Sequence, residues 1–332
     1  MSVRPLPARG RRALRSGRSA EPGVEPELPS GRQLRLVLGD QEVVVTEVGA
    51  TLRAYAVGGE PVVDGFPEDE TCADGRGQLL LPWPNRLRDG RYSFGGAEHQ
   101  LPLNEPGLGT AIHGLTRWSN WVAEPQSETR LAMRHMLHSR PGYPFILDLT
   151  ALYELDPSGL TVSISAVNRG SGPAPFGAGA HPYVRCGSGP VDGWRLRIPA
   201  AVFLLSDSRL LPTGRAGVAG RDRDFRRTRA IASTRLDTAY TDLIRDPDGR
   251  ARVTLEAVDG RRLAVWLDEA YRWVQVFTGD THPRVQDRRR SLAVEPMTCP
   301  PDAFRSGADL IVLEPGETLT ARWGIDISGF RG

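Results

Sequence analysis

The sequence predicts an all-β protein, built as one large antiparallel β-sandwich with very little helix. Runs of β-favouring residues recur from residue 33 onward, and many alternate between the two faces of a strand. Between Leu160 and Ala166, every even position is apolar and every odd position is threonine or serine. Turn-forming sequences at 156–159 and 246–249 separate such runs, and no long amphipathic helical pattern interrupts them. Numerous strands joined by short turns favour a sandwich.

The first expected strands, 33–38 and 42–48, flank a Gly39-Asp40 turn and should form a hairpin. A third run follows at 51–57. The remaining expected strands span residues 91–94, 118–124, 130–138, 145–155, 160–168, 195–198, 202–205, 251–258, 261–267, 273–278, 292–295, 310–313 and 318–327. Only short helical turns are expected, near 72–77 and 300–306.

One domain is expected after an amino-terminal tail. Residues 1–30 are rich in Arg, Pro, Gly and Ser and lack the apolar stretch of a secretory signal, so we expect a disordered tail. Residues 31–332 continue the strand pattern without a linker, which predicts a single domain. The length alone would allow two domains, but all-β domains of comparable size are familiar.

The composition excludes several classes of function. The chain has no lysine, which removes lysine Schiff-base chemistry, pyridoxal enzymes and phosphate-loop lysines. A net charge of +2 at pH 7 does not favour nucleic acid as a partner. The three cysteines, Cys72, Cys186 and Cys299, offer neither a disulfide framework nor a CxxC metal motif. A reducing, cytoplasmic location is therefore expected, with no membrane partner, because no apolar run approaches transmembrane length.

His181 is the first candidate for catalysis. It stands between the small residues Gly177 to Ala180 and Pro182, in the stretch FGAGAHPYVR. The small residues allow another backbone or a ligand to approach closely, and the proline directs the histidine towards extended geometry. A rigid ring that titrates near neutral pH suits a general acid. A loop histidine that only satisfies backbone groups is the alternative.

Two polar stretches interrupt the strand pattern in the first half of the chain. LPWPNRLRDG presents Asn85 and Arg86 from a stiff Pro-Trp-Pro loop, and AIHGLTRW presents His113 close to Trp118 and Trp121. An arginine fork is suited to sugar hydroxyls, carboxylates or phosphates, and aromatic faces suit the apolar side of a sugar ring. Both tryptophans could equally belong to the core.

Two further stretches supply carboxylates in the second half. RLDTAYTDL offers Asp237 and Asp242, and SLAVEPMTCPPDAF offers Glu295 at the end of an apolar strand, before Pro296. A carboxylate in that setting loses hydration, which raises its pKa towards the working range of a base. A buried, paired structural glutamate is the alternative.

Six motifs, in their order along the chain, resemble the aldose 1-epimerase (galactose mutarotase) family. They are LPWPNRLRDG, HGLTRW, GAGAHPYV, LDTAY, WVQVFTGD and LAVEPMTCPPDAF. The resemblance runs from roughly residue 33 to the C-terminus. It implies a large antiparallel β-sandwich that needs no cofactor and interconverts the α and β anomers of free hexoses. It also implies His181 as general acid, Glu295 as general base, and a sugar-binding set of Asn85, Arg86, His113, Asp237 and Gln275. Asp242 matches no family position.

The chemistry of anomer exchange suits these residue types. One group must take the proton of the anomeric hydroxyl while another protonates the ring oxygen, and a carboxylate and an imidazole suffice. The expected partner is a small sugar; no metal or cofactor is expected, and no oligomeric state follows from the sequence. Three alternatives stay open: a hexose-6-phosphate mutarotase, a non-catalytic sugar-binding module, and a metal enzyme that uses His113, His181 and Glu295, with Asp237 as a further candidate, as ligands.

Overall fold

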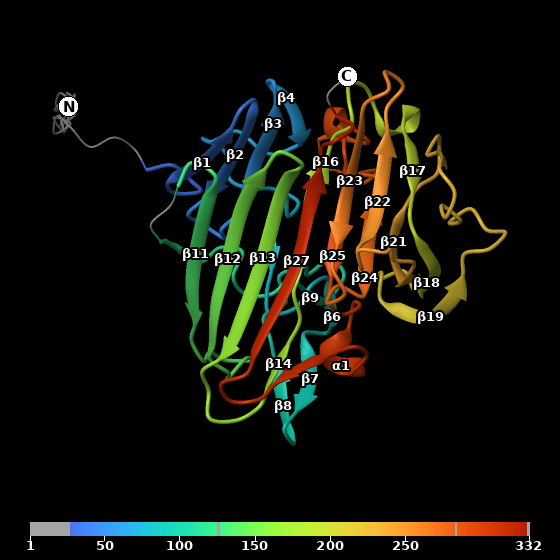
Figure 1. Cartoon of the computed structure of the whole chain (residues 1–332). Coiled ribbons are helices and arrows are strands. Elements are labelled where there is room, and N and C mark those ends of the chain that lie inside the picture. Colours follow the sequence, from blue (N-terminus) through green and yellow to red (C-terminus); the bar gives the residue numbers. More distant parts are fainter. Residues whose placement is uncertain (1–26, 125–126, 283, 331–332) are drawn as a thin grey trace, which may run out of the picture.

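Two large antiparallel sheets pack on one another in the described protein (Figure 1). The computed structural model describes residues 27–124, 127–282 and 284–330. The larger sheet has 12 strands. Its main path runs β1 (Gln33–Leu38), β2 (Gln41–Thr46), β3 (Leu52–Val57), β4 (Glu60–Val63), β16 (Tyr183–Val184), β25 (Leu292–Met297), β24 (Trp273–Phe277), β21 (Asp237–Leu243), β18 (Ala200–Ser206) and β19 (Pro212–Gly217). The short strands β5 (Leu79–Leu80) and β15 (Gly179–Ala180) pair with each other, and β15 also pairs with β25.

The second sheet has nine strands. In spatial order they are β10 (Val122–Ala123), β11 (Arg130–Leu137), β12 (Leu147–Asp156), β13 (Gly159–Asn168), β27 (Thr318–Asp326), β23 (Arg262–Leu267), β22 (Ala251–Glu256), β17 (Arg195–Arg197) and β20 (Arg229–Ala230). Three two-stranded ribbons complete the described strands. They pair β6 (Arg86–Arg88) with β9 (Thr110–Ile112), β7 (Arg91–Phe94) with β8 (Ala97–Gln100), and β14 (Ala174–Phe176) with β26 (Ile311–Leu313). Helix is limited to α1 (Ala303–Ser306) and two 3₁₀ turns, Val191–Gly193 and Val285–Asp287.

The core between the sheets follows the alternation that the sequence predicts. In β13 the apolar residues Leu160, Val162, Ile164 and Ala166 are buried, while the threonine and serines between them are partly exposed. Full burial of a valine, leucine or isoleucine side chain contributes about 1.5–3 kcal/mol. Because β13 pairs with β12 on one side and β27 on the other, this apolar face lies in the middle of its sheet. The predicted β-sandwich is confirmed.

Two of three local expectations need correction. Residues 118–124 form a strand only at Val122–Ala123, because the chain turns at Arg117 and Trp118. The segment 72–77 forms turns and no helix, because Gly75 and Gly77 have φ values of +74° and +69°. The helical turn expected near 300–306 is present as α1.

The two acidic stretches also differ from the expectation. The stretch that contains Asp237 was not among the expected strands, but Asp237 is the first residue of β21. Glu295 does not end its strand, because β25 continues through Pro296 to Met297. Met297 pairs with Trp273 on one side and Gly179 on the other, so the ladder continues past the proline.

The amino-terminal tail expected at residues 1–30 lies outside the described residues for its first 26 positions. Within the described part, Ser30 is buried and its backbone carbonyl accepts a hydrogen bond from Val48 N–H. No helix among residues 27–124, 127–282 and 284–330 has the length and apolar character needed to cross a membrane.

Candidate active site

One cleft collects all the residues that the sequence predicts for the site. It has a volume of about 840 Å³, within the usual range for small-ligand sites. Its walls come from the β5–β6 connection, β6, the segment after β9, the β15–β16 connection, β21, β24 and β25. Its lining includes Asn85, Arg86, His113, His181, Asp237, Gln275 and Glu295. Residues that are far apart in the sequence therefore converge here.

The centre of the cleft is a contact between an imidazole and a carboxyl group. His181 Nε2 lies 3.3 Å from Glu295 Oε1, and the two residues are only 6% and 3% exposed. Glu295 stands opposite Gln275 in the β24–β25 ladder, whereas His181 lies in the connection between β15 and β16. Both of those strands pair with β25, which brings the histidine to the glutamate.

Burial shifts the pKa values of this pair in opposite directions. Burial raises the pKa of Glu295 well above its usual value, with the charge of Asp237 adding to the rise and Arg86 opposing it. Burial, together with the positive charges of nearby arginines, lowers the pKa of His181 to about 3. Both shifts favour the neutral form of each group over the ionised pair.

Each member of the pair has a second polar atom that is buried without a protein partner. His181 Nδ1 and Glu295 Oε2 make no hydrogen bond within the described part of the chain. Buried polar atoms of this kind are rare in native proteins and call for a partner such as water or ligand. Their presence in the cleft indicates that the site is built for polar groups that the chain itself does not supply.

The ring of His181 is held by backbone and aromatic contacts. Its backbone N–H donates to Gln78 O at 3.0 Å, and its carbonyl accepts from Gly77 N at 2.9 Å. The ring stacks on Tyr183 at 4.9 Å and 19°, and His113 meets it edge-on at 5.3 Å. A side chain on Gly75 would lie 3.0 Å from His181 Cδ2, so this position needs glycine for space as well as for its positive φ. The ring is therefore fixed, as a general acid requires.

His113 is oriented by the residue beside Arg86. The backbone N–H of Asn85 donates to His113 Nδ1 at 3.1 Å, and His113 N–H donates to the Asn85 carbonyl at 3.0 Å. Since Nδ1 accepts, a neutral ring carries its proton on Nε2 and can donate it to a ligand. The neutral form is favoured because burial lowers the pKa of His113 well below its usual value.

Two side-chain pairs fix the remaining predicted residues. Arg86 makes a bidentate ion pair with Glu105, Nε to Oε2 at 2.8 Å and Nη2 to Oε1 at 2.9 Å. Gln275 Nε2 donates to Asp237 Oδ1 across β21 and β24. Burial raises the pKa of Asp237, opposed by the charge of Arg86. Glu105 was not foreseen, because nothing in its local sequence distinguishes it from a surface glutamate.

The aromatic stretch after His113 divides between cleft and core. Trp118 lines the cleft and is 55% exposed, whereas Trp121 is fully buried in the core. Arg117, which the motif HGLTRW contains but which was not singled out, also lines the cleft and stacks over Trp118 at 5.9 Å. Asp242 is exposed and does not line this cleft, whereas Asp237 does.

Among the described residues, one group of three His, Cys, Asp or Glu side chains lies close enough together to hold a metal ion. One ligand atom each of His113, His181 and Glu295 lies within 4.8 Å of the others. Two histidines and a glutamate match a ligand set of catalytic zinc sites. Asn85 N–H occupies His113 Nδ1, so only Nε2 of that ring would be free to bind a metal. The residue types of these three side chains are thus compatible with acid–base chemistry and with metal binding.

Comparison with known proteins gives a consistent result. The model of the family described as aldose 1-epimerase matches residues 34–326. The uncharacterized protein YihR of Escherichia coli (strain K12) is 35% identical over 289 residues, which cover 87% of this chain and 91% of that protein. Mouse galactose mutarotase is 29% identical over 207 residues, 57% of this chain and 59% of that protein. A crystal structure of a GalM/aldose epimerase homologue from C. elegans has a TM-score of 0.79 at 17% identity, covering 90% of this chain and 99% of that one.

Proposed function

The chain belongs to the aldose 1-epimerase family, and from that premise we propose that it is a cofactor-independent aldose 1-epimerase acting on free aldohexoses. The observation that carries the proposal is the contact between His181 Nε2 and Glu295 Oε1, 3.3 Å apart and buried in a sugar-sized cleft. A binding site alone would not need two titratable groups whose pKa values are shifted in opposite directions.

The proposed reaction opens and recloses the sugar ring. Glu295, as a carboxylate, takes the proton of the anomeric hydroxyl while the protonated His181 gives a proton to the ring oxygen, and the bond between C1 and that oxygen breaks. The open-chain aldehyde turns about its C1–C2 bond. The ring hydroxyl then attacks the other face of the aldehyde, returns its proton to His181, and Glu295 protonates the new anomeric oxygen. No atom or charge is gained or lost over the cycle.

The pKa shifts of Glu295 and His181 support these protonation states. When the ring is open, Glu295 carries the proton and His181 is neutral, which is the form that burial of both groups favours. The form with the closed sugar requires the ionised pair, which the buried site disfavours. Burial therefore lowers the free energy of the ring-opened state relative to the starting complex. The ring-opened sugar is the high-energy intermediate of the proposed reaction, and its stabilisation speeds the exchange.

The surrounding groups suit the hydroxyls of a hexose. Arg86, held by Glu105, presents a fixed guanidinium group, and His113 offers its Nε2 proton. Asp237 and Gln275 form a hydrogen-bonded pair that can accept and donate. Asn85 has its side-chain oxygen on Arg86 N–H at 2.8 Å, which leaves its amide NH₂ to donate to a ligand. We assign these five residues to sugar binding.

A hexose 6-phosphate is the second candidate substrate. Arg117 lines the cleft, and its guanidinium donates only to uncharged oxygens, Gln78 Oε1 at 3.3 Å and Ile112 O at 3.4 Å. Among the described residues it makes no ion pair with a carboxylate. An arginine without a carboxylate partner in the wall of a sugar site favours an anionic substituent on the sugar.

Anomer exchange measured by NMR on glucose, galactose and glucose 6-phosphate tests the proposal and ranks the two substrates. Exchange above the buffer rate, abolished in Glu295→Gln, supports an epimerase. Sugar binding without exchange would instead identify a binding module. Metal analysis of the active protein is the third measurement: a stoichiometric metal whose removal stops exchange would support the metal enzyme and overturn simple acid–base catalysis.

A further inference from the structure

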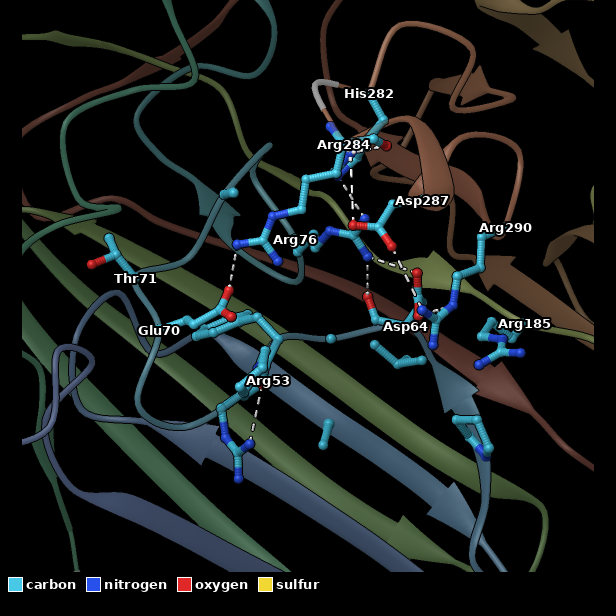
Figure 2. Close-up of a pocket in the computed structure, with 17 residues that line it drawn as sticks. Arg53, Asp64, Glu70, Thr71, Arg76, Arg185, His282, Arg284, Asp287 and Arg290 are labelled. Atoms are coloured by element: carbon cyan, nitrogen blue, oxygen red, sulfur yellow. Dashed lines mark hydrogen bonds and ion pairs between the residues drawn. The ribbon is translucent and has the colours of Figure 1, made fainter.

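A second cavity lies outside the cleft and is lined by an unusual number of arginines. It has a volume of about 400 Å³ and is bordered by β3, β4, the segment after β4, the end of β16 and the loop that precedes β25. Figure 2 shows the side chains that surround it. We call it the arginine cavity, after Arg53, Arg76, Arg185, Arg284 and Arg290. The proposed reaction uses none of these residues.

The charges in this cavity are not balanced. Its lining holds five arginines against three acidic residues, Asp64, Glu70 and Asp287, a surplus of two positive charges. Asp64 is shared by Arg76 at 2.6 Å and Arg290 at 3.4 Å, so one carboxylate serves two guanidinium groups. Close guanidinium groups repel one another, and a bound anion would relieve that repulsion.

Two of the arginines have unused donors. Arg53 donates only to the carbonyl of Phe66, at 3.2 Å, and the side chain of Arg185 has no ion pair with any described residue within 4.0 Å. The Nε groups of both are buried without a hydrogen-bond partner. Only one other arginine in the described part of the chain, Arg88, has a buried Nε without a hydrogen bond. Two such donors on one cavity indicate a missing acceptor.

We propose that the arginine cavity binds a phosphate-type oxyanion, either free or carried by a small metabolite. A carboxylate has two oxygens and is satisfied by one guanidinium fork, whereas a tetrahedral phosphate can accept from several forks at once. The cavity offers forks from separate strands and loops, Arg53 on β3 and Arg185 after β16, beside the shared pair on Asp64. Its volume holds a phosphate together with a small organic group.

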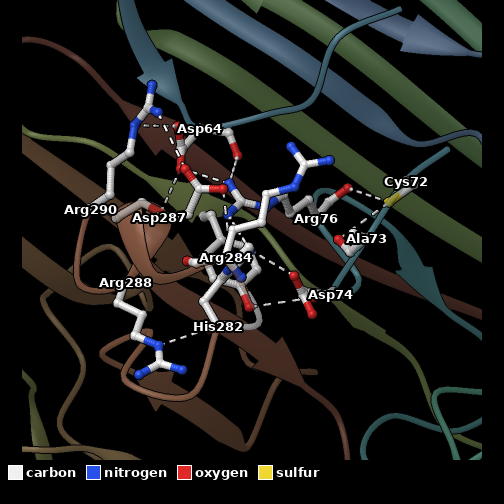
Figure 3. Close-up of polar contacts among 12 residues, drawn as sticks. Asp64, Cys72, Ala73, Asp74, Arg76, His282, Arg284, Asp287, Arg288 and Arg290 are labelled. Carbon is white, nitrogen blue, oxygen red and sulfur yellow. Dashed lines mark hydrogen bonds and ion pairs between the residues drawn. The ribbon is translucent and has the colours of Figure 1, made fainter. Parts of the chain in front are cut away.

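The arginine cavity shares a wall with the cleft but is a separate site. Arg76 stacks over the ring of Tyr183 at 5.0 Å, and Tyr183 stacks on His181. Arg76 Nη2 also contacts His282 Nε2 at 2.8 Å, which lies 2.7 Å from Asp74 Oδ2, a residue of the cleft wall (Figure 3). An anion in the arginine cavity would therefore sit one layer of side chains behind the acid–base pair.

Binding can be measured without any assay of activity. Inorganic phosphate is titrated into the full-length protein, with calorimetry, ³¹P NMR and the thermal midpoint as readouts, and with chloride at matched ionic strength as the control for screening. Glycerol 3-phosphate, as a second probe, separates a free phosphate from one carried by a metabolite. We expect saturable binding of at least one probe and a rise of the thermal midpoint that chloride does not give.

The position of the site is tested by matched variants. Arg185→Gln and Arg53→Gln should each weaken binding about 10- to 100-fold, the usual effect of losing a charge-assisted hydrogen bond. Arg252→Gln, which alters a half-buried arginine in the other sheet, and Arg117→Gln, which alters the cleft, should retain the wild-type affinity. Arg185→Lys keeps the charge and loses the fork, so intermediate affinity is expected.

Two results would overturn the proposal: a response to phosphate no larger than to chloride, or binding that is lost in Arg117→Gln and kept in Arg185→Gln. The second would place the anion in the cleft. The proposal stands apart from the proposed function. Phosphate binding without anomer exchange would support the arginine cavity as an anion site and contradict the proposed epimerase function. Anomer exchange without phosphate binding would support the epimerase function and contradict the anion site.

Discussion

Glu295→Gln is the sharpest test of the proposed mechanism. Glutamine keeps the shape of the side chain and its hydrogen bonding but cannot take up a proton. A positioned general base contributes about 100- to 10,000-fold in rate, which corresponds to about 2.7–5.4 kcal/mol of transition-state stabilisation. We expect kcat for anomer exchange to fall by that factor, while KM changes little because the residues proposed to bind the sugar hydroxyls stay in place.

The structure also predicts what this substitution does to stability. Glu295 is 3% exposed and burial favours its neutral form, which an amide imitates in volume and charge. Volume-conserving changes in a core cost about 1.5 kcal/mol or less, so the free energy of unfolding at pH 7 should change by no more than that. Glu154→Gln, on the exposed face of β12, is a control for handling and expression.

Kinetics by NMR exchange at several sugar concentrations separate kcat from KM. A variant with near-normal kcat and a raised KM would show that Glu295 binds the sugar and does not act as the base. A variant that loses both activity and its thermal transition would report unfolding, and the comparison would then rest on Glu295→Asp, which keeps a carboxyl group but withdraws it from His181.

Three further predictions follow from the same geometry. His181→Asn should lower kcat by a similar factor, and the double variant with Glu295→Gln should lose far less than the product of the single losses, because the two groups share one proton; multiplicative losses would show that they act independently. Because the pKa of His181 falls from 6.5 unfolded to about 3 folded, this group alone should cost stability as pH falls from about 6.5 towards 3, by about 1.4 kcal/mol per unit, while the raised pKa of Glu295 acts in the opposite direction. His181→Asn removes that loss. Between pH 7 and pH 5, the free energy of unfolding measured in urea should therefore fall by about 2 kcal/mol more in the wild type than in the variant. An equal pH dependence of the two proteins would refute the pKa shift of His181. Glu105→Gln should raise KM about tenfold with little change in kcat, because it frees the guanidinium of Arg86; a loss confined to kcat would contradict a binding role for Arg86.

Much of the fold could be predicted from the sequence because the two large sheets alternate cleanly. The boundaries of β1 and β7 agree with the predicted runs, and β13 shows the expected pattern of burial. The short strands were missed, since β5, β15 and β16 have two residues each and carry no periodicity. They exist because their neighbours in the sheet pair with them, which a local pattern does not record.

The residues that meet in the cleft could be named from the sequence, but the residues that support them could not. Each of the predicted residues belongs to a short motif, whereas Glu105 reaches Arg86 from a different segment and Arg76 reaches Tyr183 through tertiary packing. The arginine cavity could not be predicted either, because tertiary packing brings its residues together from separate segments. Its members are single arginines in a chain where every basic residue other than histidine is an arginine, so none stands out until the fold brings them together.

The small residues before His181 are explained by the packing of strands, and that packing places His181 beside Glu295. A side chain on Gly179 would lie 2.7 Å from Pro84 Cβ and 3.1 Å from the carbonyl of Pro296, and one on Gly177 would lie 2.5 Å from Cys299 Sγ. Only glycine lets β15 lie this close to β25 and to the loop that carries Asn85 and Arg86. Since alternate residues of a strand face opposite sides, a slip of one residue between β15 and β25 would turn Glu295 away from His181. The glycines thus permit the close packing on which the contact between imidazole and carboxyl group depends.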